Sequence, residues 1–156
     1  MMNNIDKKSD MNPEQADFYQ KMRHRIRAWI EKKSGRENRL AEFVLLAPDL
    51  FHLLCKLMLD KDVPAAKKVK VAAVILYFMT PMDLIPEAIF GPIGYLDDVA
   101  LSALVLNDLI NELDPQIVTR NWAGDRDILN IVKTIIANSD KIVGRGLWNK
   151  LRNKIK

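Results

Sequence analysis

The sequence has a single cysteine, two histidines and no long uncharged hydrophobic run. Cys55 has no partner for an internal disulfide, which favours a reducing compartment, and its apolar helical context predicts a small buried side chain. No uncharged apolar run approaches the ~20 residues of a membrane-spanning helix, and the first residues lack the apolar segment of a signal peptide. We therefore expect a cytoplasmic protein, with a peripheral position at the inner face of the membrane as the alternative.

Catalytic motifs are also missing. His24 and His52 stand apart from any nucleophile, and no glycine-rich loop that could bind phosphate is present. The sequence therefore indicates a non-enzymatic protein, although it leaves the question of an enzyme open.

Basic residues are absent from the middle of the chain. Residues 71–119 contain no Lys, Arg or His but hold seven of the 20 acids, whereas the rest carries all 24 Lys and Arg against 13 acids. Two segments, called here the basic arms, concentrate this charge: 21–39 has eight bases and two acids, and 141–156 has six bases and no acid. Such an asymmetry concerns partners rather than fold.

Apolar residues recur at helical spacing along most of the chain, and strand signals are weak. Asn12 and Pro13 open a first helix that should end near Ser34, and Pro48 should stop a second, short helix. Further helices are expected from Asp49, from Pro64 to Met79, over 99–113, from an Asp125 N-cap, and over the amphipathic end of the chain. We predict an all-α, compact bundle of about seven or eight helices. Two central apolar helices would be joined by a Pro/Gly-rich acidic loop, in one domain over 12–156 with a disordered 1–11.

The segment 80–98, TPMDLIPEAIFGPIGYLDD, carries four carboxylates and no base. Each acid has a structural explanation as a helix cap, because carboxylates accept hydrogen bonds from the free N–H groups of a first helical turn. Acids in so apolar a setting should be partly buried, and buried charge must be paired, protonated or bound to a metal. Oxygen ligands suit Mg²⁺, Mn²⁺ or Ca²⁺, with Asp83, Glu87 and Asp97 as candidate ligands and Asp98 as a supporting group or base.

The run YFMTPMDLIPEAIFGPIGYLDDVALSALVL resembles the YkvA-like family (domain of unknown function 1232), with a match over roughly residues 63–109. The loop departs from the family pattern in carrying Glu87 where Asp is common and in being one residue longer. The resemblance implies a helical module with no established activity, some of whose members are membrane-associated, with a core at about 63–113. It also implies these signature positions: Pro81, Asp83, Pro86, Glu87, Gly94, Asp97 and Asp98.

Four functions remain open. The first is docking on an anionic surface, a membrane or a membrane protein, because each basic residue near anionic lipid could contribute about 1 kcal/mol and an interfacial helix needs an apolar face. The residues expected to contact that surface are Arg23, Arg25, Arg27, Lys150, Arg152, Lys154 and Trp148. The second is a divalent-metal-binding protein or metal-dependent hydrolase, and the third is nucleic-acid binding through the helix RHRIRAWIEKK. The fourth is a shallow helical hairpin in the membrane over 71–110.

Overall fold

The computed structural model describes residues 11–37, 39–79 and 95–142. These ranges are helical with short connections and contain no strand, which confirms the all-α prediction. The predicted disorder of 1–11 and the helix at the end of the chain lie outside the described residues, apart from Met11, which packs partly against the core. The helices are α2 (Pro13–Glu31), α3 (Lys33–Arg36), α4 (Ala41–Val44), α5 (Ala47–Leu59), α6 (Ala65–Met79), α8 (Tyr95–Glu112), α9 (Pro115–Asn121), α10 (Ile128–Ala137) and α11 (Ser139–Ile142).

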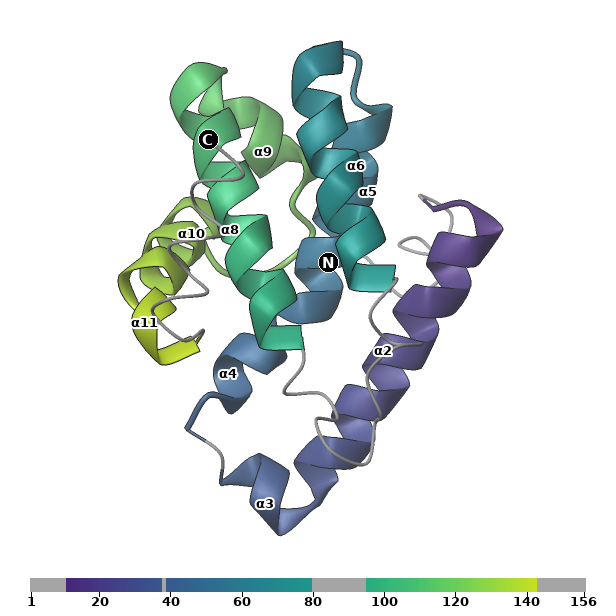
Figure 1. Ribbon diagram of the computed structural model, residues 1–156, viewed down its shortest axis with the longest axis vertical. Coiled ribbons are helices and arrows are strands. Elements are labelled where there is room, and N and C mark those ends of the chain that lie inside the picture. The colour runs from purple at the N-terminus through teal and green to yellow at the C-terminus, as the bar shows by residue number, and fades with distance from the viewer. Residues whose placement is uncertain (1–10, 38, 80–94, 143–156) are drawn as a thin grey trace.

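Helix α5 lies at the centre of the bundle together with α8. Helix α8 packs against α4, α5, α6, α9, α10 and α11. Helix α5 packs against α2, α6, α8 and α9 (Figure 1). It is apolar on most of its surface, and Leu50, Leu53, Leu54 and Leu57 are fully buried. Phe51 joins three helices, because its ring lies 5.0 Å from that of Phe18 on α2 and 5.3 Å from that of Phe78 on α6. Cys55 is buried here as predicted, and burial raises the pKa of its thiol to about 12.

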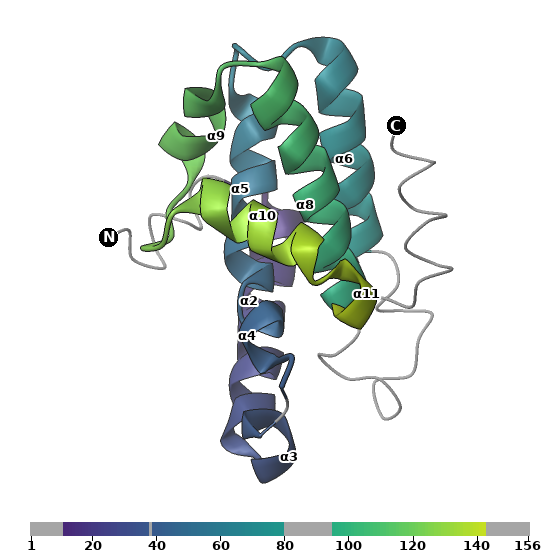
Figure 2. The same ribbon diagram turned by 90° about the vertical axis from the view of Figure 1, so that its left-hand side faces the viewer.

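Helix α10 lies across α8 on the side away from α2, and α11 follows it (Figure 2). Its Ile128, Ile131, Val132 and Ile135 are buried, so the strongly apolar stripe read from the sequence faces the core. The N-cap of α10 is Asp127, whose Oδ1 accepts from Leu129 N–H at 3.0 Å, and not Asp125 as expected. Both aspartates satisfy the sequence rule for a cap, and packing decides where the helix begins.

Helix α2 begins as predicted, with a capping box. The Asn12 side chain accepts from Gln15 N–H at 2.8 Å, and the Gln15 side chain accepts in return from Asn12 N–H at 3.3 Å. Its end comes earlier than predicted, at Glu31, because Lys32 is extended and a separate turn, α3, follows. Gly35 makes that turn possible, since a Cβ at this position would lie only 2.1 Å from the Trp29 carbonyl oxygen.

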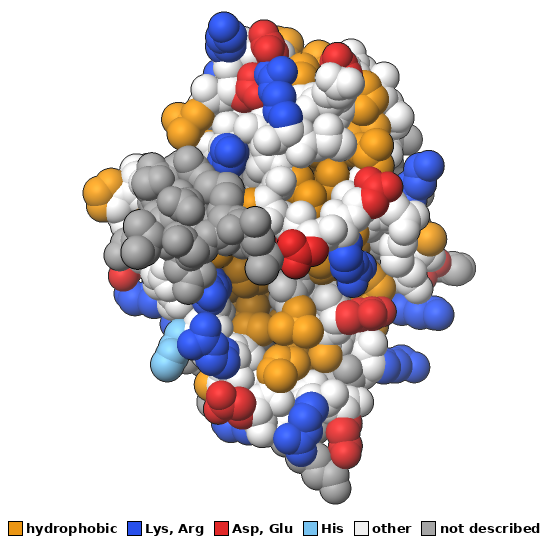
Figure 3. All heavy atoms as spheres, turned by 180° about the vertical axis from the view of Figure 1, so that it is seen from behind, with side chains coloured by type: hydrophobic (Ala, Val, Ile, Leu, Met, Phe, Trp, Pro, Cys, Tyr) orange, Lys and Arg blue, Asp and Glu red, His pale blue; other side chains and the backbone are white. Residues whose placement is uncertain are grey.

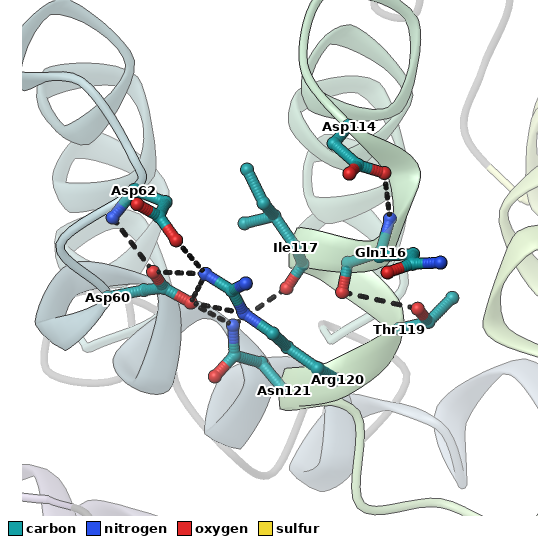
Figure 4. A network of polar contacts seen from close by, with 8 residues as sticks. All are labelled: Asp60, Asp62, Asp114, Gln116, Ile117, Thr119, Arg120 and Asn121. Carbon is teal, nitrogen blue, oxygen red and sulfur yellow. Dashed lines mark hydrogen bonds and ion pairs between the residues drawn. The ribbon is translucent and has the colours of Figure 1, made fainter.

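A polar network holds the α5–α6 connection against α9 (Figure 4). Two Arg120 nitrogens donate to the Asp60 carboxylate at 2.7–3.1 Å and one to Asp62 at 2.7 Å, while Asn121 Nδ2 donates to Asp60 at 2.8 Å. The side chain of Asp60 is 8% exposed, and its hydrogen bond from Arg120 holds the pKa of that carboxyl well below its usual range. Arg120 is the first base after the base-free segment 71–119, and its partners lie about sixty residues earlier in the chain.

The start of α5 differs from the prediction. Pro48 occupies the first turn of α5 instead of ending the preceding helix. Proline suits this position because its missing N–H would have no partner there. The short α4 ends at Val44, so Leu45 lies at a turn between two helices and its side chain is 51% exposed.

Candidate functional site

The acidic centre of the sequence forms an antiparallel helix pair, α6 and α8, with a different charge arrangement at each end. At the start of α6, Lys67 Nζ donates to Asp108 Oδ2 at 2.9 Å and also pairs with Glu112, while Lys70 Nζ lies 3.4 Å from the same Asp108 oxygen. These contacts neutralise the acids at the end of α8. Lys67 and Lys70 lie just before the base-free segment, so bases at the start of α6 pair with acids of α8 about forty residues later.

The opposite end of the pair brings Tyr77, Asp97 and Asp98 together, and we call these three residues the acidic site. Tyr77 lies in the last turn of α6 and is 37% exposed, whereas Asp97 and Asp98 lie in the first turn of α8. Burial, followed by the negative charges of Asp97 and Asp98, raises the pKa of the Tyr77 hydroxyl. Among the described residues, no Lys or Arg forms an ion pair with either aspartate.

The two adjacent aspartates have different environments. Asp97 is half-buried, and burial raises the pKa of its carboxyl. Asp98 is only 4% exposed, and burial together with the neighbouring Asp97 raises the pKa of its carboxyl well above the usual range. Its Oδ1 has no hydrogen-bond partner in the described structure. The prediction that these two loop acids are partly buried is therefore confirmed.

An acidic site of this kind can hold a proton or attract a cation. Both outcomes lower the cost of a buried carboxylate that has no basic partner. Within 11–37, 39–79 and 95–142, no group of three or more His, Cys, Asp or Glu side chains is arranged to hold a metal ion. Of the predicted metal ligands only Asp97 is described; the other predicted positions of this loop lie outside the described residues, namely Pro81, Asp83, Pro86, Glu87 and Gly94.

The N-terminal basic arm has a definite structure along α2. This helix buries Tyr19, Met22 and Ile26 against the core, which leaves the arginines outside its buried face. Arg23, Arg25 and Arg27 line a surface hollow of about 400 Å³, and the residues around it, which also include Gln20, Lys21 and His24, contain no acid. We call this hollow the basic hollow. It unites the three arginines that the sequence singled out with Lys21 and His24 of the same basic arm, which were not named as contact residues.

The side chains around the basic hollow differ in how they are held. The Arg23 guanidinium carbon lies 5.5 Å from the centre of the Tyr19 ring, at cation–π distance. Lys21 Nζ pairs with Asp17 Oδ2 at 3.1 Å, with both side chains largely exposed. Trp29 packs partly against the core instead of lining the hollow. The predicted C-terminal contact residues, Trp148, Lys150, Arg152 and Lys154, lie outside the described residues.

The two histidines lie in different environments within the part of the chain that the structure describes. His24 is exposed at the basic hollow, whereas His52 is fully buried in α5 with its ring 6.3 Å from that of Tyr19. Among the described helices, none has the length and hydrophobicity required to cross a membrane.

Comparison with known proteins supports the resemblance read from the sequence. The model of the family described as "Protein of unknown function (DUF1232)" matches residues 67–104, which run from the start of α6 into α8 and include the acidic site. "Uncharacterized protein ORF9" of Methanothermobacter thermautotrophicus is 28% identical over 97 residues, which cover 62% of this chain and 66% of that protein, slightly under two thirds of its length. No solved structure matches. The basic hollow lies outside the segment that the family model matches.

Proposed function

We propose that the protein is a non-enzymatic helical module that docks on an anionic membrane surface through the basic hollow of α2. The observation that carries this proposal is the position of three arginines, a lysine and a histidine around one hollow with no acid among its lining residues. Charge alone in a sequence does not make a site, because basic residues can be buried or paired elsewhere. Here Arg23, Arg25 and Arg27 all lie outside the face that Tyr19, Met22 and Ile26 bury, and they line the same hollow.

The position of α2 in the bundle favours contact with a large surface. The helix lies at the edge of the molecule, and its second half, with α3, extends away from the other helices (Figure 1). Within the described chain, no ion pair joins Arg23 or Arg27 to a carboxylate, so contact of these two arginines with lipid would break none. Each arginine near anionic lipid contributes about 1 kcal/mol. Three together contribute about 3 kcal/mol, or about a hundredfold in affinity.

Flotation with phosphatidylcholine vesicles, with and without phosphatidylglycerol, tests the proposal. We expect binding only to the anionic vesicles, and release as the salt concentration rises, because salt screens exposed charges. The variant Arg23→Gln/Arg25→Gln/Arg27→Gln should bind about a hundredfold more weakly.

The matched control is Lys61→Gln/Arg126→Gln/Lys133→Gln, which removes the same charge from exposed positions outside both basic arms. Equal loss in the two variants would mean that net charge and not the hollow is responsible. Absence of binding to anionic vesicles would overturn the proposal, and salt-sensitive binding of RNA or DNA in its place would favour nucleic acid, the other polyanion considered from the sequence.

A second candidate function, cation binding at the acidic site, is favoured by one observation: the buried Asp98 carboxyl whose Oδ1 lacks a partner in the described structure. Thermal melting after EDTA, then with Mg²⁺, Mn²⁺ or Ca²⁺, tests it. A cation at a hundredfold its dissociation constant adds about 2.7 kcal/mol, a rise of about 5–10 °C for a chain of this size. Asp98→Asn should abolish that rise. If no cation raises the melting temperature of the wild type, the acidic site binds none of them.

A further inference from the structure

A second hollow shares Arg23 and Arg27 with the basic hollow. It is a groove of about 390 Å³ between α2 and the start of α5, and we call it the apolar groove. Ile26, Ile30, Leu45 and Pro48 contribute its apolar lining, and Arg23 and Arg27 line it as they line the basic hollow. The two arginines therefore form a ridge with a basic hollow on one side and an apolar groove on the other.

The apolar groove leaves hydrophobic surface in contact with water. Leu45 is 51% exposed, and Ile30 is partly buried. The face opposite to that of Figure 1 shows hydrophobic side chains gathered beside Lys and Arg side chains on the α2 side of the molecule (Figure 3). The volume of the apolar groove falls within the range of about 300–1,000 Å³ that is common for small-ligand sites in proteins.

The spacing of the two arginines suits a phosphate. Arg23 and Arg27 are four residues apart on one helix and thus lie one turn apart on the same side. A guanidinium offers a planar fork of donors that matches the oxygens of a phosphate. Arg23 is also oriented by the Tyr19 ring, which lies under its guanidinium and lines the groove.

We infer that the apolar groove takes an acyl chain of an anionic membrane phospholipid whose phosphate binds Arg23 and Arg27. This inference rests on the proposed function and adds to it a site for one lipid molecule. In a ligand with one phosphate next to a hydrocarbon chain, the phosphate can bind the two arginines while the chain lies in the apolar groove.

The two acids at the groove distinguish this ligand from a polyanion. Glu31 and Asp49 also line the groove. An extended polyanion such as nucleic acid would bring further charges against them, whereas an acyl chain carries no charge past the ridge. Charge complementarity along the groove therefore favours an amphiphile over nucleic acid or an acidic peptide.

Leu45 and Leu59 provide matched variants for the test. Both leucines are exposed, 51% and 72%, but only Leu45 lines the groove, whereas Leu59 ends α5. The probe is monomeric dihexanoyl phosphatidylglycerol, compared with glycerol phosphate, which has the headgroup chemistry without a chain. Binding is followed by calorimetry and by the methyl NMR signals of Ile26, Ile30 and Leu45.

We expect the short-chain lipid to shift these methyl signals and glycerol phosphate at the same concentration to leave them in place. Leu45→Gln should weaken lipid binding about tenfold, the loss expected when one leucine contact with the chain is removed. Leu59→Gln should leave it unchanged, and Arg23→Gln/Arg27→Gln should abolish it. Thermal melting of each variant confirms that it is folded.

Three outcomes separate this inference from the proposed function. Binding of the wild type to anionic vesicles without any shift of the groove methyls would overturn the lipid site and leave surface docking intact. Binding of the short-chain lipid without binding to vesicles would support the site and overturn the docking. Equal effects of Leu45→Gln and Leu59→Gln would also overturn the assignment of the chain to the groove.

Discussion

Replacement of Asp108 by asparagine tests whether the Lys67–Asp108 contact fastens α6 to α8. Asp108 Oδ2 accepts from Lys67 Nζ at 2.9 Å, and the two side chains are 21% and 16% exposed. Loss of a hydrogen bond to a charged group costs about 1.5–3 kcal/mol. The second lysine, Lys70, adds little because its distance is 3.4 Å and its side chain is 33% exposed. We expect Asp108→Asn to lower the free energy of unfolding by about 2 kcal/mol, a fall in melting temperature of about 4–8 °C.

Glu112→Gln is the matched control, because Glu112 pairs with the same lysine. Its side chain is 55% exposed, and ion pairs at such positions contribute less than about 1 kcal/mol. Urea unfolding of both variants compares the half-buried contact with the exposed one. A cost of Asp108→Asn no greater than that of Glu112→Gln would refute the reasoning.

The pH dependence of Asp108→Asn gives an independent readout. Burial alone would raise the pKa of the Asp108 carboxyl, but the ammonium groups of Lys67 and Lys70 outweigh it and lower that pKa overall. The unfolded chain therefore binds the proton first as the pH falls, and stability is lost as the pH drops from about 3.9 through the folded-state pKa. The difference between wild type and Asp108→Asn should thus be full near neutral pH and shrink in acid. A difference that does not change with pH would exclude the ionised contact as its cause.

Three further predictions concern the acidic site, the core and the C-terminal basic arm. Asp98→Asn should gain stability relative to wild type as the pH rises above about 3.9, because the raised folded-state pKa makes the native protein bind the proton that the unfolded chain has lost. Urea unfolding at several pH values without added cation measures this, and a constant difference would contradict it. Phe51→Ala should cost about 3–5 kcal/mol in urea unfolding, because the ring is fully buried against two others, and a loss below about 1 kcal/mol would contradict the packing. Lys150→Gln/Arg152→Gln/Lys154→Gln should weaken binding to anionic vesicles about a hundredfold if this arm docks as α2 does, and unchanged flotation would assign docking to α2 alone.

Much of the candidate site could be predicted from local patterns, and part of it could not. The arginines at 23, 25 and 27 were identified from their density in the sequence, and the structure places them around one hollow. The apolar groove was missed because Leu45 comes from the turn before α5 and Pro48 from α5 itself, and nothing in their own pattern shows that they border α2. Tyr77 was recognisable as the end of an apolar helix, but its interaction with Asp97 and Asp98 depends on α6 and α8 being antiparallel neighbours.

The sequence by itself determined the features whose interactions span only a few residues. The capping box at Asn12, the end of α5 at Asp60 and the burial of Cys55 follow from hydrogen bonds and apolar spacing within about one helical turn. The tertiary structure decided which of two neighbouring candidates takes a role: Asp127 and not Asp125 caps α10, and Asp98 is more deeply buried than Asp97. It also decided that Asp60 meets Arg120. These outcomes depend on how each helix is rotated and placed against the others, and that is set by packing contacts between segments far apart in the chain.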